Sequence, residues 1–271
     1  MELRQVLAIG AKEFRDRIRN RWVLAVALVF TALALVIAYF GGAQQGAVGF
    51  RSVEFTIASL VSLVIYLIPL IALLLGFDAI VGERERGSLD LLLSMPITRF
   101  ELLLGKYLGL ALAMSVSTLG GFGLVAVILS SQLDADGLFH FVGFMVSSVL
   151  LGLVFLSVAV AISALTLDRA RASGLAIATW FFFVLVFDLV LLGLLVYTGG
   201  SYGGEVFPYL LMLNPADVFR VLNVFTLDEI RASYGLATVF PEQLASPWLL
   251  SGVMLAWIVG PLALATWRFR R

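Results

Sequence analysis

The sequence predicts an all-α, polytopic membrane protein that forms a single transmembrane domain over residues 1–271. Hydrophobic residues make up 61% of the chain and charged residues 13%, whereas ordinary soluble domains contain about 45–50% and about 25%. Six apolar runs are close to or longer than the ~20 residues that a helix needs to cross the hydrocarbon core of a bilayer. They do not alternate between apolar and polar positions as the strands of a membrane β-barrel do. The expected spans are residues 22–40, 55–80, 103–130, 138–166, 174–197 and 248–267.

The distribution of basic residues predicts that both ends of the chain are cytoplasmic. The chain has 18 Lys and Arg residues. All but Arg51, Arg220 and Arg231 lie before the first span, in the connections after the second and fourth spans, or after the sixth span. Because basic residues gather on the cytoplasmic side, this side holds both termini. An even number of spans gives the same result. The net charge of zero gives no reason to expect a nucleic acid partner.

Residues 1–21 predict an amphipathic helix that lies in the cytoplasmic interface of the membrane and contacts lipid. Apolar residues recur at steps of three and four from Leu3 through Leu7 to Ile18, and charged residues fill the other face. This is the pattern of an interfacial helix. A simple basic anchor without a fixed helical position is the alternative interpretation.

The connection between the second and third spans, residues 83–101, is too strongly patterned for a simple tether. We expect Gly87 to end the extension of the second span and Ser88 to cap a short helix, with Asp90 in the first turn where the helix dipole favours an acidic group. Pro96 disfavours a helical conformation at the residue before it and so ends this short helix.

The third span begins with a second set of capping signals. Thr98 and Glu101 have the spacing of a Ser/Thr-x-x-Glu capping box, in which each side chain bonds to the backbone N–H of the other residue. Ile97 and Leu102 occupy the positions of a hydrophobic staple around it. The sequence therefore predicts a rigid, capped helix laid across the cytoplasmic face between two spans.

The outer segment between the fifth and sixth spans, residues 198–247, predicts short helices instead of a solvated loop. It begins with a glycine-rich stretch and is interrupted by prolines, including Pro208 and Pro215. Residues 210–222 between these breaks are too apolar for a solvated loop and too interrupted for a span. We expect re-entrant helices that dip into the outer leaflet or pack on the spans.

Few residues in the apolar regions could carry chemistry. His140, the only histidine, lies at the outer end of the fourth span, and the chain has no cysteine and six scattered methionines. The sequence therefore indicates no metal site. Asp188 lies well inside the fifth span with no basic residue inside any span to pair with it, so it is a candidate for a subunit interface, a proton relay, a substrate path or a structural carboxyl. Asp78, near the cytoplasmic end of the second span, is expected to pair with Arg84 or Arg86.

The cytoplasmic connection resembles the signature of type 2 ABC exporter permeases. That signature contains an acidic and basic run, a Gly-Thr-Leu-Glu step, a Pro-Ile-Ser/Thr-Arg step and a Gly-Lys pair, which is Gly105-Lys106 in this sequence. Ser88 and Asp90 replace the usual Thr and Glu. In this family the segment is the coupling helix that docks on the ATPase subunit. The resemblance therefore assigns ATPase coupling to Glu83, Arg84, Glu85, Arg86, Gly87, Ser88, Asp90, Pro96 and Arg99.

The outer segment also resembles the corresponding part of this family. Its Leu-Asn-Pro-Ala-Asp-Val-Phe-Arg run implies that a periplasmic partner is contacted by Asn214, Pro215, Asp217, Phe219 and Arg220. Within the family, the chain most resembles the permease subunits of ABC systems that mature nitrous oxide reductase in denitrifying bacteria. This implies a homodimer in the bacterial inner membrane, joined to two cytoplasmic ABC ATPases and to a periplasmic copper-handling protein. In such permeases the second and fifth spans form the dimer interface.

The resemblance implies that this chain binds no cofactor and catalyses no reaction, with ATP and Mg on the partner ATPase. The sequence contains no Gly-x-x-x-x-Gly-Lys-Ser/Thr loop for a nucleotide. Two other functions stay open. One is a type 2 ABC exporter of another cargo, such as a drug, sodium or gliding-motility system. The other is a secondary transporter driven by an ion gradient through Asp188. A membrane enzyme is disfavoured because no nucleophile and base can be paired.

Overall fold

The computed structural model describes residues 2–19, 22–40, 53–129, 135–199, 206–224 and 244–269. Over these residues the chain is helical and contains no strand, which confirms the all-α prediction. The helices are α1 (Leu3–Arg19), α2 (Trp22–Phe40), α3 (Val53–Gly76), α4 (Val81–Glu85), α5 (Ser88–Leu93), α6 (Arg99–Leu129), α7 (Ala135–Leu165), α8 (Arg169–Phe181), the π-helix η2 (Phe182–Val186), α9 (Phe187–Tyr197), α10 (Phe207–Leu211), α11 (Pro215–Val224) and α13 (Pro247–Phe269).

Five of the six predicted spans have a counterpart that is long and apolar enough to cross a membrane. These stretches are Thr56–Glu85, Arg99–Ile128, Ala135–Leu165, Arg169–Tyr197 and Pro247–Phe269. The first predicted span coincides with α2, a helix of 19 residues. Within α2, the described apolar stretch Leu28–Ile37 is too short to be one of these five spans. A sixth span therefore stays a prediction.

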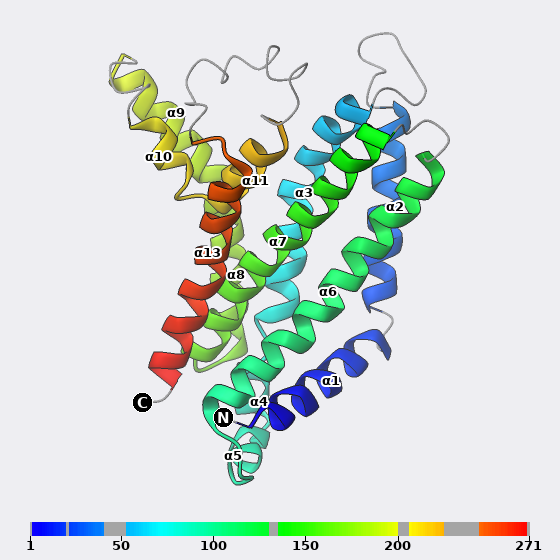
Figure 1. Ribbon diagram of the computed structural model, residues 1–271. Helices are drawn as coiled ribbons and strands as arrows, with labels where there is room; N and C mark the ends of the chain where they lie inside the picture. The colour runs from blue at the N-terminus through cyan, green and yellow to red at the C-terminus, as the bar shows by residue number, and fades with distance from the viewer. Residues whose placement is uncertain are drawn as a thin grey trace.

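The spans surround α7, which lies at the centre of the bundle (Figure 1). It packs against α3 on one side and α13 on another, and also against α6 and α11. Large aromatic side chains fill this contact region: Phe122, Phe144, Phe155 and Phe219 are all less than 2% exposed. Such side chains bury the largest apolar area per residue. The core therefore fixes how α3 and α13 stand relative to α6.

Both chain ends lie at the same end of the bundle as α4 and α5 (Figure 1). We call this the α5 end and the opposite one the outer end. At the α5 end, α1 lies along the lower half of α6 (Figure 1). Leu3 and Leu7 on α1 are 65% and 58% exposed, while Val6 and Gly10 are buried. An exposed apolar stripe of this kind suits the predicted position in the membrane interface.

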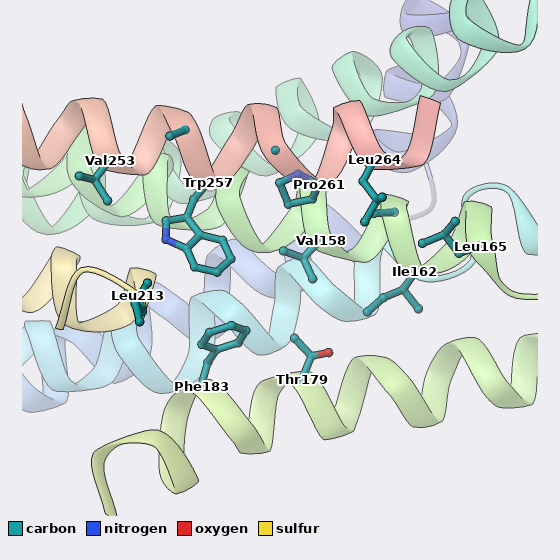
Figure 2. Close-up of a pocket in the computed structure, with 13 residues that line it drawn as sticks. Val158, Ile162, Leu165, Thr179, Phe183, Leu213, Val253, Trp257, Pro261 and Leu264 are labelled. Atoms are coloured by element: carbon teal, nitrogen blue, oxygen red, sulfur yellow. The ribbon is translucent and has the colours of Figure 1, made fainter. Parts of the chain in front are cut away.

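The fifth span is longer than expected and is not a uniform helix. It begins at Arg169 instead of residue 174, because the Asp168 side chain accepts a hydrogen bond of 2.8 Å from the N–H of Arg171 and caps the first turn. In its middle, η2 adds one wide turn between α8 and α9. Such turns mark places where a helix departs from regular packing. An apolar groove lies beside this turn, between α8 and α13 (Figure 2).

The prediction of short outer helices is confirmed for the described part of residues 198–247. These helices are α10 and α11, and α11 packs on α7, α3 and α13. The glycine-rich opening at 200–205 and residues 225–243, which include Pro241, lie outside the described residues. The described helices therefore lie against the spans and form part of the bundle's outer end.

Candidate functional site

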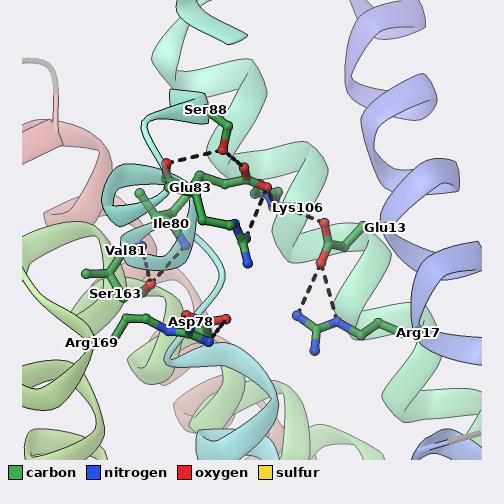
Figure 3. Close-up of polar contacts among 11 residues, drawn as sticks. Glu13, Arg17, Asp78, Ile80, Val81, Glu83, Ser88, Lys106, Ser163 and Arg169 are labelled. Atoms are coloured by element: carbon green, nitrogen blue, oxygen red, sulfur yellow. Dashed lines mark hydrogen bonds and ion pairs between the residues drawn. The ribbon is translucent and has the colours of Figure 1, made fainter. Parts of the chain in front are cut away.

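The connection between α3 and α6 is built from two short helices that are held against α7. After α3 ends at Gly76, a four-residue turn leads into α4. The hydroxyl of Ser163, which is fully buried on α7, accepts hydrogen bonds from the N–H groups of Ile80 (2.9 Å) and Val81 (3.0 Å) (Figure 3). These bonds satisfy backbone donors that the break between the helices leaves without an intrahelical partner. The start of α4 is thereby fixed to the core.

The turn between α4 and α5 confirms one prediction and corrects another. Gly87 has φ of 70°, a left-handed conformation that glycine adopts without the steric penalty of a Cβ atom. Asp90 lies in the first turn of α5 as expected. Ser88, however, is the first helical residue, and Gly87 occupies the N-cap position. The Ser88 hydroxyl donates back to the carboxylate and the carbonyl oxygen of Glu83, so it ties α5 to α4 instead of capping α5.

The predicted capping box at the start of α6 is confirmed. The Thr98 hydroxyl accepts the N–H of Glu101 at 3.2 Å, and the Glu101 carboxylate accepts the N–H of Thr98 at 2.8 Å. The other carboxylate oxygen of Glu101 accepts the N–H of Glu2 at 2.7 Å. One side chain thus satisfies donors of both α6 and the segment that leads into α1.

Lys106 is the centre of a buried ionic network. Only 7% of its side chain is exposed, and its Nζ atom lies 3.1 Å from the carboxylates of both Glu13 and Glu83 (Figure 3). Glu13 also pairs with Arg17 at 3.3 Å, and Glu83 lies 3.8 Å from Arg86. The network joins α1, α6 and α4 through charges that are largely removed from solvent. Withdrawal of either α1 or α4 would therefore remove one of the two carboxylates that compensate the buried lysine.

The close approach of α1 to Lys106 depends on two glycines of α6. A Cβ atom at Gly105 would lie 2.8 Å from the Cβ of Ile9, and one at Gly109 would lie 2.5 Å from the carbonyl oxygen of Gly10. Residues four apart share one helix face, so this Gly-x-x-x-Gly spacing makes a flat surface for a second helix. In the Gly105-Lys106 pair, the glycine admits α1 and the lysine binds it.

On its other side, α4 holds the connection between α7 and α8. The guanidinium of Arg84 donates to the carbonyl oxygens of Thr166 and Ala164 at the end of α7. The Glu85 carboxylate accepts the N–H of Arg169 at 2.7 Å, at the start of α8. A cation at a helix C-terminus and an anion at an N-terminus both suit the helix dipole. Both residues therefore fasten α4 to the fourth and fifth spans.

Asp78 forms an ion pair, but its partner is neither of the two expected residues. Arg169 approaches its carboxylate at 2.6 and 2.7 Å (Figure 3). Arg84 is occupied by the carbonyl oxygens of α7, and Arg86 lies toward Glu83. The actual partner is 91 residues away in the sequence, which is why local spacing did not reveal it.

The accessible face of the connection lies on α5 and the turn after it. Leu91 is 67% and Met95 50% exposed, and the neighbouring Asp90 and Pro96 are exposed as well. Arg86 adds a half-exposed cation. Apolar side chains rimmed by polar groups are typical of protein interaction surfaces. The residues of the connection thus fall into two groups: those that anchor it, and those that it presents at its surface.

Arg99 belongs to the anchoring group. Its guanidinium donates to the carbonyl oxygen of Phe269 at 2.8 Å and lies 5.4 Å from the centre of the Phe269 ring. Such a cation–π contact adds to the hydrogen bond. The end of α13 is therefore fixed to the start of α6.

At the outer end, Asn214 organises the start of α11. Its side-chain oxygen accepts the N–H of Ala216 at 3.0 Å, and its Nδ2 donates to Asp217 at 2.8 Å and to the carbonyl oxygen of Phe183 in η2 at 2.9 Å. Pro215 is the first helical residue, where its missing N–H is not needed. The Asn-Pro-Ala-Asp motif is thus a helix cap that also binds the wide turn of the fifth span.

Arg220 supplies the partner that the sequence did not reveal for Asp188. Its guanidinium donates to Asp188 at 3.1 Å and also to Asp217. The prediction that no basic residue inside a span pairs with Asp188 agrees with this contact, because Arg220 lies on α11, which is not a span but packs beside η2. Burial raises the pKa of the Asp217 carboxyl to about 7, with Arg220 opposing the shift and Asp188 adding to it.

The outer motif mainly serves the interior of the chain. Asn214, Asp217 and Phe219 are at most 1% exposed, and Pro215 is buried. Phe219 packs near the ring of Phe144, with 6.2 Å between the ring centres. These four side chains are occupied by capping and core packing, which does not suit the predicted direct contact with a periplasmic partner. Only Arg220, with 34% of its side chain exposed, keeps part of its surface accessible.

No metal centre is apparent in the described part of the chain. There, no three His, Cys, Asp or Glu side chains gather closely enough to hold an ion. His140 lies in the second turn of α7 with its Nδ1 atom 3.0 Å from the carbonyl oxygen of Asp136. This contact, one turn back along the same helix, suits the structural role that its position at the end of the fourth span suggested.

The fold and the two-helix connection together define a multi-pass membrane protein with an anchored, partly exposed helical connection at one end. The family model described as ABC-2 family transporter protein matches residues 7–271, and the chain therefore belongs to this family and is an ABC transporter permease subunit. It is 45% identical over 276 residues to the "Probable ABC transporter permease protein NosY" of Stutzerimonas stutzeri, with 99% of each chain covered. It is 46% identical over 272 residues to the protein of the same name from Pseudomonas aeruginosa, with 98% of each covered. The type 2 ABC permease resemblance of the cytoplasmic connection is thereby confirmed.

Proposed function

We propose that this permease passes the energy of ATP hydrolysis from a separate cytoplasmic ATPase to the outer face of the membrane, for assembly of the copper site of nitrous oxide reductase. Similarity to NosY permeases over nearly the whole chain supports this system. The observation that carries the coupling role is the contrast within the connection. Its anchoring side chains are engaged in ion pairs and helix-end hydrogen bonds, while Leu91 and Met95 stay exposed at its surface.

Force applied at α5 has defined routes into the bundle. Through Ser163, Arg84 and Glu85 it reaches the end of the fourth span and the start of the fifth. Through Lys106 it reaches α1 and the third span. A docking element that shares hydrogen bonds and ion pairs with α6, α7 and α8 moves with them. An ATPase that displaces α5 would therefore displace the α5 end of the whole bundle.

The route to the outer face runs along the fifth span. Asn214 bonds to the carbonyl oxygen of Phe183 in η2, and Arg220 pairs with Asp188 one turn further along the span. These two links fix α11 to the irregular turn itself and to the start of α9 just after it. Movement of the span would shift α11, which together with neighbouring exposed outer residues would meet the periplasmic copper-handling partner.

The complete assembly in this proposal is a homodimer of the permease in the bacterial inner membrane with two ABC ATPases. ATP and Mg bind to the ATPases, and this chain contributes no catalytic group or cofactor. Both termini and α5 face the cytoplasm, as the distribution of basic residues indicates. The second and fifth spans form the dimer interface, as in related permeases.

A secondary transporter that works through Asp188 has less support from the structure than from the sequence alone, because Arg220 holds this carboxylate in an ion pair. A type 2 ABC exporter of another cargo would share the coupling connection, and no observation in the described residues favours such a cargo. The similarity to NosY permeases is why the nitrous oxide reductase system remains the proposed function.

The coupling role is tested by co-purification with the cognate ATPase. Leu91→Arg places a charge on the exposed face without touching the buried network, and we expect loss of the ATPase from the purified complex. Lys12→Glu is the control, since it changes an exposed charge of α1 at the same end. Undiminished ATPase binding and turnover in Leu91→Arg would refute the docking role of α5.

The cargo assignment is tested separately in a denitrifying host that lacks the gene for this chain. The proposal predicts nitrous oxide reductase with an incomplete copper content, restored by the wild-type chain but not by Leu91→Arg. A full copper content in the deletion strain would exclude this system while leaving the coupling role intact.

A further inference from the structure

A laterally open, apolar groove lies between the fourth, fifth and sixth predicted spans. It has a volume of about 660 Å³. Val158 and Ile162 of α7 form its floor, Phe183 stands on one side, and Trp257 and Leu264 of α13 stand on the other (Figure 2). The indole N–H of Trp257 is used by the carbonyl oxygen of Met212. The groove is therefore an almost purely hydrocarbon surface.

The groove extends over about one leaflet of a bilayer. On α13 its lining runs from Val253 to Leu264, which corresponds to about 16 Å at 1.5 Å per residue. The hydrocarbon core is about 30 Å thick, so this length is close to half of it. Leu165, the last residue of α7, also lines the groove. The groove therefore opens at the α5 end and reaches past the middle of α13, toward Leu213.

The two helices beside the groove face away from the rest of the chain. In both Arg169–Tyr197 and Pro247–Phe269, only 17% of the most apolar 18-residue stretch is buried inside the protein. Leu264 at the groove itself is 51% exposed. The groove is thus open to the surroundings of the bundle, and in a membrane these are acyl chains or another membrane-embedded helix.

Positive charge stands at the α5 end of the groove. Arg268 follows Leu264 by one helical turn and is exposed. Arg171, in the first turn of α8, has a side chain that is 71% exposed and shares Asp168 at 3.0 Å. The carboxylates of Asp168 and Glu85 already occupy the start of α8. Arg268 is therefore the group at this end that would attract an anion at the level of lipid headgroups.

We propose that the groove binds one acyl chain of an anionic phospholipid from the leaflet at the α5 end. The lipid phosphate lies near Arg268, and the chain runs along Leu264 and Trp257 toward Val253. The length of the groove, its hydrocarbon lining and the charge at one end all match this ligand. A bound chain fills space between the spans that no side chain of the protein fills, and so holds α8 and α13 apart.

The proposal is tested by lipid retention. The purified permease, with its partner subunits where they co-purify, is placed in nanodiscs of equal phosphatidylglycerol and phosphatidylethanolamine, and retained lipid is counted by native mass spectrometry. Gly260→Phe fills the groove, and we expect it to lose the retained phosphatidylglycerol. Leu112→Phe, on an exposed part of α6 outside the groove, is the control and keeps it. Arg268→Gln should lower the preference for phosphatidylglycerol by about fivefold, the effect of one basic residue at an anionic surface.

Two results would overturn the proposal. The first is equal retention of phosphatidylglycerol by the wild type and by Gly260→Phe. The second is a disulfide-linked dimer formed through Gly260→Cys in the membrane, which would identify a second copy as the occupant. The chain has no natural cysteine, so such a bond reports on this position alone. If Gly260→Phe does not fold, Val253→Trp at the opposite end of the groove replaces it.

Discussion

The ionic network around Lys106 allows a quantitative prediction for Lys106→Met. This change keeps an unbranched side chain that is one atom shorter and removes its charge. The carboxylates of Glu13 and Glu83 each lose a partner at 3.1 Å, and their side chains are only 12% and 16% exposed. Removing one member of a buried ion pair costs about 3–5 kcal/mol because the other charge stays buried and uncompensated. We expect the free energy of unfolding to fall by about this amount, a rise of at least roughly 150-fold in the unfolding equilibrium constant.

The assay is reversible denaturation of the purified permease in detergent, followed through its tryptophan fluorescence. The triple variant Glu13→Gln, Glu83→Gln, Lys106→Met removes the three charges together and should recover part of the loss, because no charge is then left alone. A loss below about 1 kcal/mol for Lys106→Met would equal that of an exposed ion pair and would refute the buried network. Equal losses for the single and triple variants would contradict the reasoning in the same way.

Three further predictions concern the contacts of α1 and α11. Gly109→Leu should displace α1 from α6 and make it accessible to protease, whereas Gly120→Leu on the same helix, where nothing lies within 4 Å of a Cβ, should not; equal protection of α1 would contradict the close contact. Arg220→Gln should destabilise the chain more than Asp188→Asn in chemical denaturation, because Asp217 is 1% exposed and would lose its cation; a larger effect of Asp188→Asn would reverse the order of importance. Because burial raises the pKa of Asp217 to about 7, above the value of about 3.9 in unfolded chains, the folded state binds its proton more tightly. Its contribution to stability is thus present below about pH 4 and lost as the pH rises toward 7. Asp217→Asn should flatten this part of the pH profile of unfolding, and an unchanged slope would show that Asp217 does not titrate there.

Local signals in the sequence predicted the elements of the cytoplasmic connection well. The capping box of Thr98 and Glu101 and the break at Gly87 follow from backbone chemistry within a few residues, and both are confirmed. Ser88 was assigned the wrong role because a serine after a glycine can either cap the next helix or bond backwards. The choice depends on Glu83, whose position is set by Lys106.

Contacts between distant segments could not be predicted from spacing. Asp78 pairs with Arg169 across 91 residues, and Asp188 pairs with Arg220 across 32. Neither of these separations along the sequence follows from the repeat of a single helix, since each pair joins two different helices. The partner of Asp188 was missed for a further reason: only residues inside the spans were considered, whereas α11 packs beside the fifth span.

The role of the outer motif shows the limit of an argument from resemblance. The Asn-Pro-Ala-Asp run was interpreted as a surface for a partner, yet Asn214 and Asp217 are buried and serve as a cap. The signal for a cap was present, with Asn before Pro and an acidic residue three positions later. Helix-start rules applied to this segment would have placed α11 correctly.

The central claim, that ATP-driven movement enters at α5 and reaches the outer face, is tested most directly by a distance measurement. Spin labels attached through Tyr197→Cys, at a position 91% exposed at the outer end of α9, report the separation of the two copies in the dimer with its ATPases. The distance is measured by double electron–electron resonance without nucleotide and with ATP trapped by vanadate. The account predicts that trapped ATP changes the distance and that Leu91→Arg abolishes this change. A distance that does not respond to ATP, or that responds equally in Leu91→Arg, would contradict it.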